Sequence, residues 1–161
     1  MPRSVFLTLI LATILGIPVA DIRAQVSNPA APATRDATHQ RASTMKIRMT
    51  VEDKILTATL EDNPTSKDFV SLLPITLTLK DYAATEKIGD LPRRLSIEGT
   101  PAGSDPSIGD ITYYSPWGNL AIFYRDAGYD SGLIKLGAIE SGIEALNRPG
   151  SFEVTIDLVG K

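Results

Sequence analysis

The stretch ITYYSPWGNLAIFY, residues 111–124, holds two short runs of β-branched, aliphatic and aromatic residues separated by Pro-Trp-Gly-Asn. β-Branched and aromatic residues favour strands, whereas Pro, Gly and Asn favour turns. We therefore expect strands at residues 111–114 and 120–124, joined by a turn at 116–119.

The alternation of apolar and polar residues continues on both sides of this stretch. A period of two residues indicates a strand with one buried face. It predicts further strands at residues 45–51, 56–60, 75–79, 133–136 and 152–158. The first two form an expected hairpin around Glu52-Asp53, although this is not a favoured turn pair. The pattern predicts a mostly antiparallel β domain.

A first short helix is expected after Asn63-Pro64, because Asn caps helices and Pro suits the first helical position. Thr65 and Asp68 offer an alternative capping box, with Asp in place of the usual Glu. Phe69 begins an apolar face spaced at i, i+3 and i+4, which we expect to plug a core before a proline ends the helix.

A second short helix is expected at residues 141–146, stopped by Pro149-Gly150. Several short strands with only two small helices favour a closed barrel over a layered α/β fold. The fold predicted from the sequence is therefore mainly β, a small closed barrel with two short helices.

The chain divides into three predicted segments. Residues 1–24 have a basic residue, an apolar run and small residues in the order of a secretory signal peptide. The apolar run is short for a membrane span, so an uncleaved anchor is the less favoured alternative. Residues 25–44 are rich in Ala, Pro, Ser and Thr, which predicts a flexible linker. The folded domain is expected at 45–161, in the periplasm or secreted, with no membrane association after cleavage.

Composition argues against several chemistries. The net charge is −3, and Arg93-Arg94 is the only adjacent basic pair of the predicted domain, so a nucleic-acid partner is not expected. The chain has no Cys and a single His, His39 of the linker, which argues against a catalytic triad or a zinc site. No phosphate-binding glycine motif occurs. Asp105, Asp126 and Asp130 lack the ligand spacing of an EF-hand, so no metal and no cofactor is predicted.

Several motifs together resemble those of the bacterial cyclophilin-like proteins. The most specific is Gly109-Asp110 followed by Tyr114-Ser115-Pro116-Trp117-Gly118-Asn119. The resemblance extends over residues 45–158 and implies a small closed β-barrel whose openings are covered by short helices. True cyclophilins isomerise X-Pro bonds with an arginine on a Phe-His-Arg strand. This sequence has no Phe-His-Arg, so no catalytic residue is carried over from the family.

Aromatic residues around the 116–119 turn are the candidate binding residues. Trp117 is either a stacking wall for a ligand or a plug of the barrel, and the plug is the favoured interpretation because aromatics near strand ends are often core. The adjacent pairs at 113–114 and 123–124 point to opposite faces of their strands, so one member of each is expected in the core. The predicted groove comprises Arg94, Tyr114, Trp117, Phe123 and Tyr124.

For the two arginines, the favoured interpretation is an exposed charge paired with Glu86 or Glu98. A guanidinium that grips a carbonyl or carboxylate is the alternative.

Two functions then remain open. The favoured one is a non-enzymatic module that binds a peptide or a small molecule. The alternative is a peptidyl-prolyl isomerase with a non-standard site. The sequence does not determine the oligomeric state.

Overall fold

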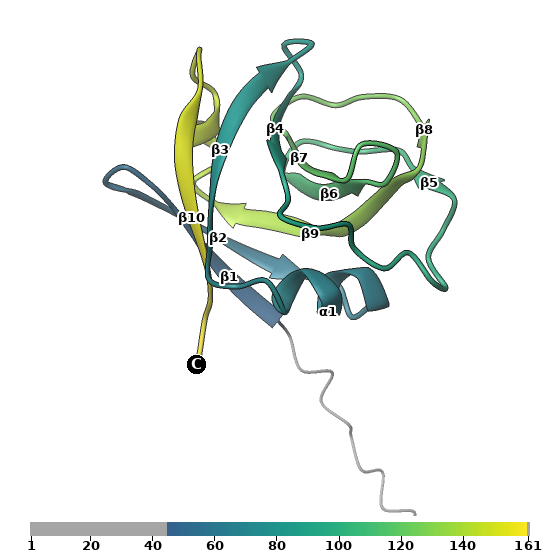
Figure 1. Ribbon diagram of the computed structural model, residues 1–161. Coiled ribbons are helices and arrows are strands. Elements are labelled where there is room, and N and C mark those ends of the chain that lie inside the picture. The colour runs from purple at the N-terminus through teal and green to yellow at the C-terminus, as the bar shows by residue number, and fades with distance from the viewer. Residues whose placement is uncertain (1–44, 161) are drawn as a thin grey trace, which may run out of the picture. The chain divides into compact units, whose positions relative to one another are not determined.

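The computed structural model describes residues 45–160, which form one β-barrel domain (Figure 1). The predicted signal peptide 1–24 and linker 25–44 lie outside the described residues and stay predictions. The elements in chain order are β1 (Met45–Val51), β2 (Lys54–Leu60), α1 (Pro64–Val70), β3 (Ile75–Tyr82), β4 (Glu86–Asp90), β5 (Gly103–Ser104), β6 (Asp110–Tyr114), β7 (Asn119–Phe123), β8 (Asp130–Ser131), β9 (Leu133–Ser141), the 3-10 helix η1 (Ile143–Leu146) and β10 (Phe152–Leu158).

Eight strands close into an antiparallel barrel in the order β1-β10-β3-β4-β7-β6-β9-β2. Closure pairs β2 with β9 and β1 with β10, so no barrel strand is left at an edge. The short strands β5 and β8 form a separate two-stranded sheet beside the barrel (Figure 1). The prediction of a mainly β, small closed barrel is confirmed.

The β1–β2 hairpin shows how the alternating pattern becomes structure. Its register runs from Met45 opposite Leu60 to Val51 opposite Lys54, as the alternation predicts. Alternate side chains such as Ile47 and Leu56 are fully buried in the core. The turn at Glu52-Asp53 is possible because Glu52 adopts a positive φ of 54°.

Helix α1 begins as predicted and ends earlier than the apolar spacing suggests. The Asn63 side chain accepts a hydrogen bond from the Ser66 backbone N–H at 2.8 Å, which confirms the predicted cap. The alternative capping box is wrong, because the Thr65 hydroxyl donates to the Ser96 carbonyl instead. Phe69 is fully buried in the barrel core, so the predicted plug is confirmed for this residue.

The second predicted helix is only a 3-10 turn. Strand β9 continues to Ser141, and η1 occupies only Ile143–Leu146. Gly142 separates the two elements with a positive φ of 85°. The domain therefore has one α-helix rather than the two short helices expected. Among residues 45–160 no helix is long and apolar enough to cross a membrane.

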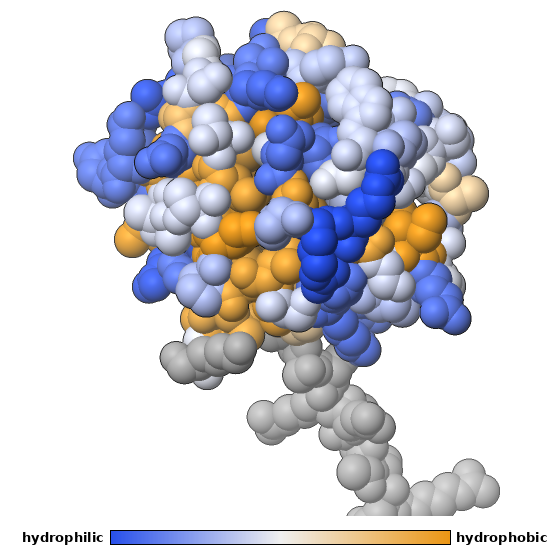
Figure 2. All heavy atoms as spheres, in the orientation of Figure 1, coloured by the Kyte–Doolittle hydropathy of each residue, from blue (hydrophilic) through white to orange (hydrophobic). Residues whose placement is uncertain are grey.

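Two hydrophobic clusters occupy opposite faces of the same strands. The larger fills the barrel and includes Tyr113, Leu120 and Ile122. The smaller lies on the outer face of β4, β7 and β9, and comprises Ile88, Ala121, Phe123 and Leu133 with Tyr114 and Ala127 against it. Figure 2 shows apolar side chains reaching the surface between hydrophilic ones. The outer cluster is what makes a ligand pocket possible outside the barrel.

Candidate functional site

A pocket of about 240 Å³ opens on the outer face of the barrel, over the second hydrophobic cluster. Its lining is Tyr82, Ala83, Thr85, Glu86, Pro106, Tyr114, Trp117, Asn119, Phe123, Ala127, Gly128, Asp130 and Leu133. The floor comes from β4, β6 and β7, and loops before β6 and after β7 supply the opposite wall. This volume lies just below the usual range of ligand pockets, about 300–1,000 Å³. It suits a small molecule or a single side chain.

Three aromatic rings form one corner of the pocket. Trp117 meets Tyr82 with ring centroids 5.5 Å apart at 88°, and Tyr114 with centroids 5.3 Å apart at 83°. Both contacts have the edge-to-face geometry that aromatic pairs prefer. Trp117 is 56% exposed, so the favoured prediction that it plugs the barrel is wrong. The alternative, a wall beside a ligand, is the interpretation that its position supports.

The turn that carries Trp117 is held by backbone geometry and by Arg94. Gly118 has a φ of +79°, and its N–H donates to the Tyr114 carbonyl at 2.8 Å. The Arg94 guanidinium donates to the Ser115 carbonyl at 2.5 Å and the Pro116 carbonyl at 3.0 Å. Arg94 thus stabilises the turn through its backbone carbonyls. It does not line the pocket, which corrects its placement in the predicted groove.

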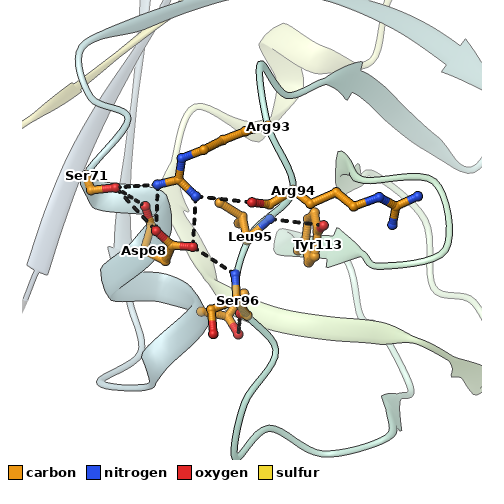
Figure 3. Close-up of polar contacts among 8 residues, drawn as sticks. Asp68, Ser71, Arg93, Arg94, Leu95, Ser96 and Tyr113 are labelled. Carbon is orange, nitrogen blue, oxygen red and sulfur yellow. Dashed lines mark hydrogen bonds and ion pairs between the residues drawn. The ribbon is translucent and has the colours of Figure 1, made fainter.

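The segment that carries Arg94 is itself anchored to α1. Arg93 donates two hydrogen bonds to the Asp68 carboxylate, at 2.9 and 2.6 Å, and one to the Ser71 hydroxyl (Figure 3). The hydrogen bonds from Arg93, followed by one from the Ser96 backbone N–H, lower the pKa of Asp68 to about 2. Figure 3 shows the Arg94 guanidinium pointing away from this cluster. The predicted pairing of the two arginines with Glu86 or Glu98 is therefore wrong.

Glu86, the first residue of β4, is the acidic group of the pocket wall. Its side chain is partly buried, and this burial, with a smaller contribution from the nearby Asp130 carboxylate, raises the pKa of Glu86 to about 7. No hydrogen bond from residues 45–160 counteracts that shift. The carboxyl therefore changes charge near neutral pH, in a wall that it shares with the Asp130 carboxylate and with apolar and aromatic side chains.

Asn119, the first residue of β7, places a second unsatisfied acceptor at the pocket. Its side chain is 2% exposed, and its Nδ2 donates to the Leu120 carbonyl at 3.1 Å. That bond orients the amide, so Oδ1 is the remaining acceptor. Oδ1 is buried and accepts no hydrogen bond from any residue within 45–160. A buried acceptor without a partner is rare in proteins.

Tyr124 lies away from this pocket, near the side chains on the opposite face of β4. Lys87 is fully buried at the barrel interior and binds Asp81 at 2.8 Å and the Arg148 carbonyl at 2.5 Å. The Tyr124 hydroxyl donates to the same Asp81 carboxylate at 2.7 Å. Of the predicted groove, the structure brings together Tyr114, Trp117 and Phe123 in the pocket lining, and places Tyr124 and Arg94 outside it.

Comparison with known proteins identifies the fold family. The model of the cyclophilin-like family matches residues 49–157. The chain belongs to the cyclophilin-like family. Its structure is similar to the solution structure of the hypothetical protein AF2241 from Archaeoglobus fulgidus, with a TM-score of 0.58 and 18% identity. The likeness covers 73% of this chain and 97% of that protein, and shows the fold alone. No curated protein matches the sequence.

Sequence reasoning missed three pocket residues of this cyclophilin-like domain: Tyr82, Glu86 and Asn119. A signal for Glu86 does exist, since the two-residue period places it on the same face as Ile88 of the outer cluster. Nothing local indicates Tyr82, because its neighbour Trp117 is distant in the sequence. Asn119 was interpreted only as a turn residue, which hid its buried side chain.

No metal site is found in the part of the cyclophilin-like domain that the structure describes, as no group of three acidic or His side chains could hold an ion there. The three aspartates considered from the sequence have separate positions. Asp126 accepts a hydrogen bond from the Ile108 backbone N–H at 2.8 Å. Asp130 faces the pocket, and Asp105 lies between β5 and β6. The pocket can bind and desolvate a ligand with its own side chains.

Proposed function

We propose that this cyclophilin-like domain is an exported, non-enzymatic binding module that takes a small molecule or one side chain of a peptide. One observation carries the binding proposal: Glu86 and the Asn119 Oδ1 lack hydrogen-bond donors among residues 45–160, inside a pocket whose aromatic corner already exists. The proposal of export depends on the signal-peptide pattern of residues 1–24.

The energetic argument is that an unsatisfied polar group is costly to the folded domain. Leaving a buried donor or acceptor without a partner costs about 1–3 kcal/mol. A ligand that donates hydrogen bonds to the Glu86 carboxyl offsets the cost of burying its charge, and the apolar body of the ligand gains contact with Trp117 and Tyr82. The pocket is therefore preorganised for a ligand, since its aromatic side chains pack against one another.

Binding is favoured over the alternative of proline isomerisation. That reaction needs a hydrogen-bond donor beside the X-Pro bond in a desolvating pocket. No basic side chain is among the pocket residues. The nearby Arg94 guanidinium already donates to the Ser115 and Pro116 carbonyls. The pocket groups at Glu86 and Asn119 Oδ1 are suited to accepting hydrogen bonds from a ligand rather than to stabilising a twisted amide.

A fragment screen read by NMR tests the proposal. Neutral and charged fragments and blocked tripeptides are added to ¹⁵N-labelled protein, and amide shifts are mapped onto the structure. We expect the binders to shift amides of the pocket lining, and Trp117→Ala to weaken their binding by about tenfold, as the loss of an aromatic contact worth about 1.4 kcal/mol predicts.

Ile55→Ala is the matched control, because Ile55 is similarly exposed (59%) and lies on β2, outside the lining. It should leave the fragment affinities unchanged. Fragments that shift amides only elsewhere on the barrel, or a screen without any pocket binder, would refute the proposed function.

A further inference from the structure

We infer that the pocket selects an organic cation that carries N–H donors, an ammonium or guanidinium group belonging to a free amine or to a basic side chain of a peptide. This inference depends on the proposed function, because it names the ligand class of the same pocket. It follows from the charges, the acceptors and the rings of the lining taken together.

The charged side chains of the pocket lining are all acidic. Glu86 on β4 and Asp130 on β8 both line it, and no lining residue is Lys or Arg. Three cations near the pocket point elsewhere. Lys87 points to the barrel interior and pairs with Asp81, and Arg94 binds backbone carbonyls. The Arg125 guanidinium lies over the Tyr124 ring, outside the lining. An anionic ligand would meet two carboxylates here without a compensating charge, whereas a cation would be attracted.

The charged groups of this pocket, the Glu86 and Asp130 carboxylates, are hydrogen-bond acceptors when ionised, whereas its donors are the neutral Trp and Tyr groups of the lining. Asn119 Oδ1 is buried and without a donor from the described residues, and its Nδ2 is occupied by the Leu120 carbonyl. The Glu86 carboxyl adds two further oxygens. A ligand that satisfies these atoms must bring N–H or O–H donors, and ammonium and guanidinium groups are donors only.

The aromatic corner suits a cation as well. The rings of Tyr82 and Tyr114 each stand nearly perpendicular to the Trp117 ring, so a group in the pocket meets both ring faces and ring edges. A cation within about 6 Å of a Trp or Tyr centroid is attracted by the electron-rich face. Phe123 adds apolar surface beside the alkyl part of such a ligand.

Proton linkage distinguishes a cation from a neutral ligand. Because burial and Asp130 raise the pKa of Glu86 to about 7, the Glu86 carboxyl holds its proton below neutral pH. A bound cation favours the ionised carboxylate, so its affinity should rise as the pH increases through 7 and level off above. The titratable or charged groups around Glu86 are Asp130, Tyr82 and Lys80 of β3, and Tyr124 with Arg125 after β7.

The experiment uses the fluorescence of Trp117, which is the single tryptophan of the sequence. The probes are butylguanidinium and butylammonium as free cations, a blocked Ala-Arg-Ala tripeptide as a peptide source, and butylurea as a neutral isostere of the guanidinium. Titrations are run at pH 6 and pH 8. We expect the cations to bind more tightly than butylurea by about tenfold at pH 8, as for a charge-assisted hydrogen bond.

Glu86→Gln keeps the shape of the side chain and removes its charge. It should remove most of the preference for cations and abolish the rise of affinity with pH. Glu153→Gln is the matched control, because Glu153 is an exposed carboxylate on β10, outside the pocket. Asp130→Asn is a second test if Glu86→Gln folds poorly, because Asp130 is at an exposed position. We expect it to weaken cation binding to a smaller extent than Glu86→Gln.

The peptide and free-ligand arms identify the source of the cation. Tighter binding of the tripeptide than of butylguanidinium indicates a peptide, and the reverse order indicates a free amine or guanidine. Equal binding of butylurea and the cations, or cation affinity that ignores pH and Glu86→Gln, would overturn the inference. If the cations fail while fragments still bind the pocket by NMR, the inference is wrong and the proposed function stands. If neither the cations nor the fragments bind the pocket, both the inference and the proposed function are wrong.

Discussion

Glu86 and Lys87 are neighbours on β4 with opposite side-chain directions and opposite electrostatic situations. Lys87 points inward, is fully buried, and has an Asp81 carboxylate and a backbone carbonyl within hydrogen-bond distance. Glu86 points outward into the pocket, and burial raises its pKa because no hydrogen bond from residues 45–160 offsets the cost of its charge. The more deeply buried charge is the better satisfied one.

The difference between Lys87 and Glu86 distinguishes polar groups that stabilise the fold from polar groups that are available for binding. The inner face of the barrel satisfies every charge it buries, as a stable core requires. The outer face keeps one buried unsatisfied acceptor, Asn119 Oδ1, and the partly buried Glu86 carboxyl, whose charge is disfavoured by burial, at a cost to stability that a binding site commonly carries. Tyr113 and Tyr114 repeat the contrast on β6. The Tyr113 hydroxyl accepts a hydrogen bond from the Leu95 N–H, whereas Tyr114 faces the pocket.

The largest expected effect is on the inner face. Tyr113→Ala removes a ring that is 1% exposed and should lower the free energy of unfolding by about 3–5 kcal/mol, because a cavity replaces it and the Leu95 N–H loses its acceptor. Tyr114→Ala, on the outer face, should cost about 1 kcal/mol. Urea unfolding followed by circular dichroism measures both. Equal losses would break the distinction between the two faces.

The second expected effect concerns the cost of the Glu86 charge. Its pKa lies above the ordinary 4.5, so between pH 4.5 and about 7 the native state keeps a proton that the unfolded chain has lost. The stability of the domain should therefore fall by about 1–2 kcal/mol as the pH rises through this window, allowing for solvent screening. Glu86→Gln should remove this fall and be more stable than the parent at pH 8. Parallel pH profiles of the two proteins would contradict this.

The smallest expected effect is on Trp117, which distinguishes a pocket wall from a plug. Trp117→Ala should cost about 1 kcal/mol, since only edge contacts with Tyr82 and Tyr114 are lost. A plug would cost about 3–5 kcal/mol. The parent indole, 56% exposed, should emit at long wavelength and be quenched readily by iodide. A loss of stability as large as that expected for Tyr113→Ala would show that Trp117 is part of the core instead.

The alternating strands were predictable because their periodicity is local. The hairpin at 45–60 and the strands near 111–124 follow from side chains whose inward and outward character repeats every two residues. Strand β4 was not predicted. Its residues Glu86 and Lys87 are both charged, so the apolar signal of a buried strand is absent on both faces, for different reasons.

The candidate site was predictable only in part. Tyr114 and Phe123 follow from strand alternation, and the turn that presents Trp117 follows from Pro116 and Gly118. The role of Arg94 did not follow, because a guanidinium that binds backbone carbonyls leaves no sequence signature. The acidic wall was missed because Asp130, held on β8 opposite Ser104 of β5, lies near Glu86 of β4 through a contact between distant segments that no local pattern encodes.

Barrel closure has a consequence for the order of folding. Strand β1 forms its second ladder with β10, where Arg48 lies opposite Asp157, and β2 pairs with β9. Such contacts join segments far apart in the sequence, and the entropy of closing the intervening loop opposes them until the barrel assembles. Domains dominated by non-local strand pairs fold over milliseconds to seconds rather than microseconds. A chain synthesised from its N-terminus therefore cannot close this barrel until β10 has emerged. Until then β1 lacks its second partner strand, while the intervening strands can already pair.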